Sequence, residues 1–141
     1  MSEVKIEQLD PIKIPLIKKL YKDHYPSAKA KKSELIITIS ESNQLSGVVR
    51  FREIEHFRLL TGMLTIPEKR GMGLANKLMA HCKSNILTRS DYCFAYSHLE
   101  LFYQKHSFIR VEVDDMPNSV KCLFLRYVNS GKDLIPMQFV G

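Results

Sequence analysis

The chain has 141 residues, of which 45% are hydrophobic and 26% are charged, with a formal net charge of +6. This length suits one domain spanning residues 1–141, and the composition excludes wholesale disorder, collagen-like repeats and low-complexity scaffolds. No apolar run approaches the roughly 20 residues that a membrane-spanning helix needs, and the N-terminus alternates charged and aliphatic residues, unlike a signal peptide, so we expect a cytoplasmic protein.

The first half of the chain has the hydrophobic pattern of one helix and four strands. Val4–Leu9 alternates with period two, as a strand does. Apolar residues then recur at helical spacing up to His24, and the helix is expected to begin at Pro11 or Pro15. A polar, lysine-rich connection follows. Short gaps then favour an antiparallel meander of three strands, expected at 34–40, 45–54 and 57–66.

The second half of the chain alternates between helical and strand patterns. A basic, glycine-rich turn follows Pro67, and apolar residues at i, i+3, i+4, i+7 and i+11 predict an amphipathic helix over 75–86. Later elements are expected as a strand at 92–96, a helix at 99–105 and strands at 109–113 and 120–128. The predicted fold class is α/β of the α+β type: a single mixed, mostly antiparallel sheet of about seven strands with helices on both faces.

The cysteines and the C-terminal tail carry no chemistry that the pattern can identify. Cys82, Cys93 and Cys122 are odd in number, widely spaced and set among apolar residues, so we expect buried free thiols and no metal site. The tail, 129–141, is too apolar to remain free in solvent. It is expected to pack on the body of the protein or on a second subunit, which would make a homodimer.

The positive charge suits a polyanionic partner, either a nucleic acid or a small ligand that carries phosphates. The densest basic run contains Lys29, Lys31 and Lys32 and has no interleaved aromatic residues. A solvated loop is therefore the preferred interpretation of this run, and a nucleic-acid patch is the alternative.

The segment Leu64–Ala75 places a strand, a tight turn and a helix N-terminus in immediate succession. Two basic residues and two glycines stand in the turn: Lys69, Arg70, Gly71 and Gly73. A helix start binds anions, because its first N–H groups lack intrahelical acceptors, and glycines let a pyrophosphate approach them closely. The segment has no Gly-Lys followed by Ser or Thr, as in a P-loop, and Asn76 replaces the third glycine of a dinucleotide fingerprint. It predicts a phosphate-binding turn, with a purely structural turn as the alternative.

Two stretches resemble motifs of the GNAT superfamily of N-acetyltransferases. Arg70-x-x-Gly73-x-Ala75 is similar to the family's acyl-CoA-binding signature, Q/R-x-x-G-x-G/A. Leu101–Phe108 is similar to a later motif in which a helix ends in Tyr and runs into Gly-Phe and a strand, with Ser107 in place of that Gly. The predicted element order is also the family's order, so the resemblance covers about residues 3–128.

The resemblance implies a GNAT-like acyl-CoA N-acyltransferase fold and direct transfer of an acetyl group from acetyl-CoA to a primary amine. Acetyl-CoA would be a co-substrate, and the acceptor a small molecule or a peptide. The family places acetyl-CoA where two parallel strands splay apart, here those ending at Ile66 and Tyr96. The residues expected to bind it are Leu64, Thr65, Ile66, Lys69, Arg70, Gly71, Met72, Gly73, Leu74 and Ala75. Tyr103 is the expected general acid for the departing thiolate, and His98 is a candidate base.

One departure from the family pattern keeps other interpretations open. Many members carry an acidic residue on the fourth strand, whereas Leu60–Met63 has none here, and the nearest acids are Glu53 and Glu55. An acyl-CoA-binding module without turnover is therefore an alternative, and a basic nucleic-acid-binding protein is a further one. The identity of the acceptor amine does not follow from the sequence.

Overall fold

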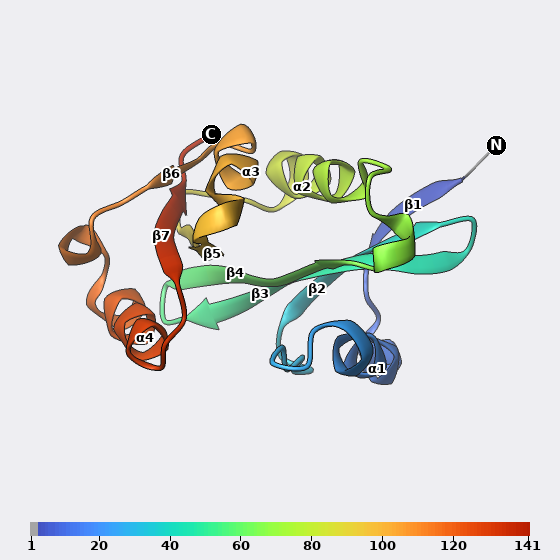
Figure 1. Cartoon of the computed structure of the whole chain (residues 1–141), viewed down its shortest axis with the longest axis horizontal. Coiled ribbons are helices and arrows are strands. Elements are labelled where there is room, and N and C mark those ends of the chain that lie inside the picture. The colour runs from blue at the N-terminus through green and yellow to red at the C-terminus, as the bar shows by residue number, and fades with distance from the viewer. Residues whose placement is uncertain (1–2) are drawn as a thin grey trace. The chain divides into compact units, whose positions relative to one another are not determined.

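The computed structural model describes residues 3–141, whose seven strands form a mixed sheet in the order β1-β2-β3-β4-β5-β7-β6 (Figure 1). The strands are β1 (Val4–Gln8), β2 (Leu35–Glu41), β3 (Gln44–Ile54), β4 (Phe57–Thr65), β5 (Asp91–Tyr96), β6 (Phe108–Arg110) and β7 (Leu134–Phe139). The helices are α1 (Ile14–His24), α2 (Leu74–Asn85), α3 (Glu100–Lys105) and α4 (Asn118–Asn129). β4 and β5 run parallel, whereas the pairs β1–β2, β2–β3, β5–β7 and β6–β7 are antiparallel. The predicted fold class is confirmed.

The described chain consists of two compact units. The first contains the residues up to Arg52 together with Thr61–Cys82, and the second contains Glu53–Leu60 together with Lys83–Gly141. The single domain expected over 1–141 stays a prediction. No helix within residues 3–141 combines the length and the apolar composition needed to cross a lipid bilayer.

In the first unit, two helices lie on opposite sides of β2 and β3 (Figure 1). The face of α1 that carries Ile14, Ile17 and Tyr21 packs against Ile36 of β2 and Val48 of β3. Each of the two prolines proposed as a helix start lies in the first turn of a helical element. Pro11 opens a short 3₁₀ turn capped by the preceding aspartate, and Pro15 lies in the first turn of α1, where a missing N–H is tolerated.

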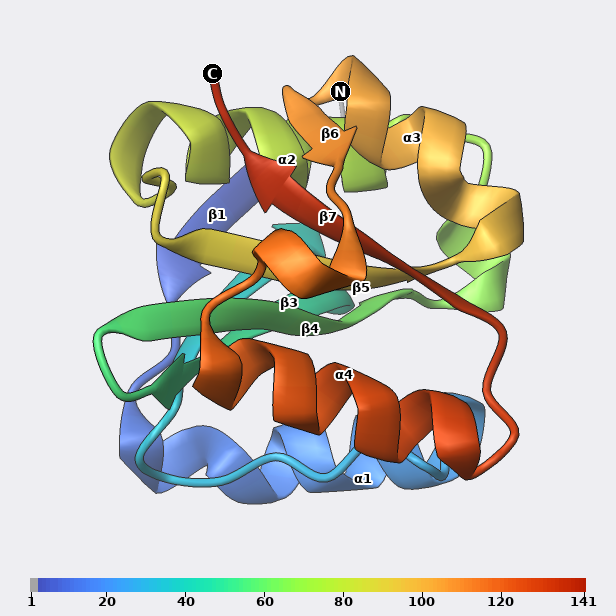
Figure 2. The ribbon, with the colours of Figure 1, turned by 90° about the vertical axis from the view of Figure 1, so that its left-hand side faces the viewer.

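In the second unit, α3 and α4 lie on opposite sides of the β5–β7 pair (Figure 2). Alternation along β5 explains this, because successive side chains of a strand point to opposite faces. Tyr92 packs in a core cluster with α4, and the ring of Phe94 meets that of Phe124 edge to face at 5.1 Å. Cys93, between them in sequence, is hydrogen-bonded to Tyr103 of α3.

The end of the chain differs from the sequence-based prediction. Residues 120–128, expected as a strand, belong to α4, and residues of the tail form β7, which lies between β5 and β6. Val120, Leu123 and Phe124 are buried at helical spacing. Leu125 and Val128 are exposed, so burial along this segment repeats with the helical period near 3.6. The β-branched and aromatic residues of the segment have strand propensity, which led to the prediction of a strand. The strand expected at 109–113 is shorter, ending at residue 110.

The cysteine prediction is correct for two of the three positions. Cys82 and Cys93 are buried free thiols, whereas Cys122 is exposed. Its place on α4 explains the error. Cys122 lies two positions after Val120, about 200° around the helix, so the buried stripe leaves it on the solvent side.

Candidate active site

The turn predicted to bind phosphate lies wholly in the first unit, between the end of β4 and the start of α2. Ile66 is buried, and its N–H donates to the carbonyl of Ser46 at 2.9 Å, which continues the pairing of β4 with β3. A 3₁₀ turn, Pro67–Lys69, then redirects the chain, closed by a hydrogen bond from Arg70 N–H to Pro67 C=O at 3.3 Å. The chain reaches α2 at Leu74, which is buried and anchors the helix start.

Both glycines of this turn have backbone angles that favour glycine. The φ angles of Gly71 and Gly73 are +86° and +75°, a region that other residues adopt only at a cost. A Cβ built on either glycine would meet nothing within 4 Å, so the space above both is open. The carbonyl of Gly73 accepts the first hydrogen bond of α2, from Lys77 N–H at 3.1 Å, so the helix begins directly after this glycine. Open space and a helix start coincide here, as an anion-binding turn requires.

The two basic side chains of the turn are held by hydrogen bonds within the first unit. The ammonium of Lys69 lies 2.6 Å from the carboxylate of Glu41 at the end of β2, and both side chains are mostly buried. Arg70 Nε donates to the carbonyl of Thr65 at 3.1 Å. The charge of Lys69 is therefore balanced by Glu41, which leaves backbone amides and Arg70 as the groups suited to a phosphate.

Glu41 was not among the residues identified from the sequence. It lies 28 positions before its partner, and no local pattern connects the two.

Thr65 was expected at the site, and the structure adds an observation about its side chain. Its hydroxyl is buried and has no hydrogen-bond partner within the described residues. An unpaired hydroxyl at the end of β4 suits a polar group of a bound molecule.

The segment of β4 that lacks the expected carboxylate has an irregular backbone. Gly62 has φ +65°, and its carbonyl accepts a 2.7 Å hydrogen bond from the hydroxyl of Tyr21. A Cβ at Gly62 would lie 2.5 Å from that hydroxyl and 2.7 Å from Arg50 Nε, so only glycine fits. Burial raises the pKa of Tyr21 to about 12, although Arg50 opposes the shift. Tyr21 is therefore a neutral donor that fixes the bend in β4.

The two expected catalytic residues lie in the second unit, in contrasting environments. Tyr103 is only 4% exposed, and its ring contacts those of Phe102 and Phe108 edge to face at centroid distances of 5.1 and 5.8 Å. Burial raises the pKa of the Cys93 thiol to about 12, and the hydrogen bond from Tyr103 opposes this shift. His98 is exposed in a 3₁₀ turn, and its ring stacks on Tyr96 at 6.1 Å.

These positions agree only in part with what was expected of a site. The ten residues predicted to bind the cofactor form one continuous structure, from the end of β4 to the first turn of α2. Tyr103 and His98 come from adjoining turns of the second unit, but one is enclosed by aromatic rings and the other faces solvent. Within residues 3–141, no group of three or more His, Cys, Asp or Glu side chains is placed to hold a metal ion.

Comparison with known proteins supports the resemblance seen in the sequence. A family profile described as an acetyltransferase (GNAT) domain matches residues 11–125, most of the chain. A search of curated protein sequences finds no significant match.

Several solved structures share the fold at low sequence identity. N-acetylglutamate synthase from Neisseria gonorrhoeae, in complex with coenzyme A and N-acetyl-glutamate, has a TM-score of 0.75 at 14% identity; the alignment covers 97% of this chain but only 35% of that one. The ribosomal-protein-S18-alanine N-acetyltransferase of Escherichia coli has a TM-score of 0.69 at 11% identity, covering 97% and 93% of the two chains. Arabidopsis thaliana Naa50, bound to the bisubstrate analogue CoA-Ac-MVNAL, has a TM-score of 0.69 at 13% identity, covering 98% and 99%. The chain therefore belongs to the GNAT family of acetyltransferases.

Proposed function

We propose that this protein transfers an acetyl group from acetyl-CoA to a primary amine of a small molecule or a peptide. The observation that carries the proposal is the turn before α2, where Gly71 and Gly73 have positive φ and open space above them. A pyrophosphate is the ligand that such a turn suits, because it needs several N–H donors within reach and no Cβ in the way. Membership of the GNAT family supports an acyl-CoA as the bearer of that pyrophosphate.

The residues of the first unit would bind and orient the co-substrate. Acetyl-CoA supplies the activated thioester. In this proposal the backbone N–H groups of 71–75 hold the pyrophosphate, helped by the side chain of Arg70, while Lys69 keeps the turn fixed to β2 through Glu41. The backbone at and just after the end of β4, Leu64–Ile66, would pair with the amides of the pantetheine arm through the groups that Ser46 and Arg70 leave unoccupied. The unpaired hydroxyl of Thr65 is one further donor for it.

Tyr103 is the residue to which the proposal assigns proton donation. A phenol has a reference pKa of about 10, so it is protonated at neutral pH and can protonate a leaving thiolate. Its ring is held by Phe102 and Phe108, which limits its rotation. The acceptor must be deprotonated before it attacks. His98 is exposed, and an imidazole nitrogen can accept a proton from the acceptor amine, so we assign it as the candidate base.

A second candidate function is an acyl-CoA-binding module without turnover. One observation favours it: the segment Leu60–Met63 has no carboxylate that could serve as a base. Such a protein would retain the turn before α2 but would lack an efficient route for deprotonating the amine.

Two measurements separate these functions. Calorimetry should detect binding of CoA, and a ligand at 100 times its dissociation constant stabilises a protein by about 2.7 kcal/mol, which a thermal unfolding assay registers. Release of free thiol from acetyl-CoA should then be followed with a panel of amines. The names and bound ligands of the structural relatives suggest glutamate and peptides that begin with alanine or methionine as acceptors, and a polyamine extends the panel.

The outcomes are distinct. CoA binding with amine-dependent thiol release supports the transferase. CoA binding without thiol release above the rate of spontaneous hydrolysis supports the binding module. Absence of CoA binding at millimolar concentration would overturn both.

A further inference from the structure

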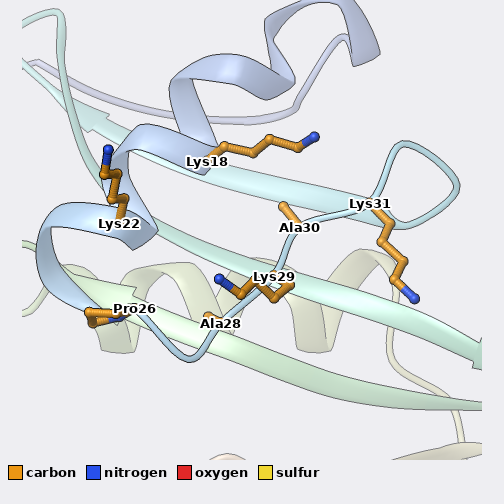
Figure 3. Close-up of a pocket in the computed structure, with 7 residues that line it drawn as sticks. All are labelled: Lys18, Lys22, Pro26, Ala28, Lys29, Ala30 and Lys31. Atoms are coloured by element: carbon orange, nitrogen blue, oxygen red, sulfur yellow. The ribbon is translucent and has the colours of Figure 1, made fainter.

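The first unit contains a second basic feature, separate from the turn before α2. Four lysines line a pocket of about 540 Å³ between α1 and the connection from α1 to β2 (Figure 3). They are Lys18, Lys22, Lys29 and Lys31. The remaining lining residues are small, one proline and two alanines. The lysine-rich run noted in the sequence therefore borders a concave surface, which a solvated loop alone does not explain.

The register of α1 places two of these lysines at the pocket. Lys18 and Lys22 are four residues apart and lie on one side of the helix, next to the stripe of Ile14, Ile17 and Tyr21 that faces the sheet. Both residues line the pocket, although their ammonium groups extend in different directions (Figure 3), and the flexible four-carbon stem of a lysine allows each group to turn over the pocket. Both side chains are exposed.

The connection after α1 is fixed by a buried ion pair. Arg50 and Glu34 lie 2.7 Å apart with side chains 7% and 4% exposed. Arg50 Nη1 also donates to the carbonyl of Lys29 at 2.6 Å, and the N–H of Lys31 donates to Glu34 at 2.6 Å. Ala30, between the two lysines, is buried in the core beneath α1. The backbone of both lysines is therefore held in place, so the pocket wall is preorganised.

The charge of the pocket is uncompensated. None of the four lysines forms an ion pair within residues 3–141, whereas the neighbouring Lys19 pairs with Asp23 at 3.3 Å. Four like charges around one concavity repel one another, and a bound anion would offset that repulsion. The lining has no aromatic ring for base stacking and no arginine for bidentate recognition of a carboxylate. Lysine ammoniums act as point charges, which suits a compact ligand of high charge density.

We propose that this pocket binds a compact polyphosphate: several phosphate groups in a chain or cluster, free or on a small molecule. The site is distinct from the turn before α2, because α1 and α2 lie on opposite sides of β2 and β3 (Figure 1). A nucleic acid is the less suited ligand, since it would need a longer basic track and stacking residues.

Calorimetry with inorganic triphosphate tests the proposal on the full chain. Binding should be weakened about tenfold or more in Lys22→Gln/Lys29→Gln, because two ammonium–phosphate attractions are lost. The double variant Lys13→Gln/Lys105→Gln is the matched control, since it removes the same charge from exposed lysines outside the pocket and should bind almost as the wild type does. Triphosphate binding should also persist in Gly73→Val, because this substitution lies in the turn before α2 and not in the lysine pocket. Raising the salt concentration should weaken it.

Three results would overturn the proposal. Equal weakening in the two double variants would show that net charge alone attracts the anion. Loss of triphosphate binding in Gly73→Val, with wild-type binding in Lys22→Gln/Lys29→Gln, would place the anion at the turn before α2. Tighter binding of a single-stranded oligonucleotide than of triphosphate, abolished by Lys22→Gln/Lys29→Gln, would show that the lysines recognise nucleic acid.

Discussion

Replacing Gly73 with valine should weaken CoA binding tenfold or more while leaving the protein folded. The φ of Gly73 is +75°, and an L-residue in the left-handed region costs about 1–2 kcal/mol. The added Cβ meets nothing within 4 Å, so no clash increases this cost. For a domain of this size we expect the melting temperature to fall by about 3–8 °C. The new side chain occupies the open space above the turn, and loss of one charge-assisted hydrogen bond there costs about 1.5–3 kcal/mol, equivalent to about 10- to 150-fold in affinity.

Two further variants separate backbone strain from obstruction of the ligand. Gly131 has φ +102°, and a Cβ on it would also meet nothing within 4 Å, so Gly131→Val reproduces the strain in the turn after α4. It should lower the melting temperature similarly without changing CoA affinity. Gly73→Asn should fold more stably than Gly73→Val, because asparagine tolerates positive φ, yet it should bind CoA weakly.

Calorimetric titration with CoA, after circular dichroism has shown each variant to be folded, measures the effect. Wild-type affinity in folded Gly73→Val would refute the assignment of this turn to the pyrophosphate. Equal losses of affinity in Gly73→Val and Gly131→Val would also refute it, because general destabilisation would then explain both.

Tyr103→Phe should lower kcat by about 10²-fold, as loss of a general acid does, with KM for acetyl-CoA little changed; a wild-type kcat in steady-state assays would end that assignment. Asp91 is fully buried and accepts two 2.8 Å hydrogen bonds from Arg58, so Asp91→Asn should lower the free energy of unfolding by about 3 kcal/mol in urea titrations. A loss below about 1 kcal/mol would contradict a structural role for this ion pair. Burial and nearby lysines lower the pKa of His106 in the folded protein. Between that pKa and the ordinary histidine value of about 6.5, the unfolded chain therefore binds more protons than the folded one. The free energy of unfolding should decrease as the pH falls through this range. His106→Gln should weaken the dependence of the unfolding free energy on pH, as measured by denaturant titrations at several pH values. An unchanged dependence in this variant would show that His106 is not its source.

Local pattern was sufficient where the chemistry is local. The turn before α2 could be identified from Leu64–Ala75, because its strand end, its glycines and its amphipathic helix are consecutive in the chain. Residue type also permits the positive φ at Gly71 and Gly73, which few other residues adopt. The order of the elements was also read from the hydrophobic pattern, and it agrees with the structure up to β6; beyond β6, residues 120–128 form α4 instead of a strand, and the tail supplies β7. Helix α4 was predicted as a strand because its valines and aromatic residues have strand propensity, and packing against β5 overrides that preference.

Tertiary structure alone decided the partners of the charged and polar side chains. Lys69 was expected to attract phosphate, and only the fold brings Glu41 to within 2.6 Å of its ammonium, from 28 positions earlier in the chain. Tyr103 could be identified by its place in a motif, but its hydrogen bond to Cys93 depends on how α3 packs on β5. The sequence by itself therefore predicted which residues would bind an acyl-CoA, because backbone geometry and residue type are local properties. The balance of charge around those residues depends on distances between segments remote in sequence, which only the folded chain defines.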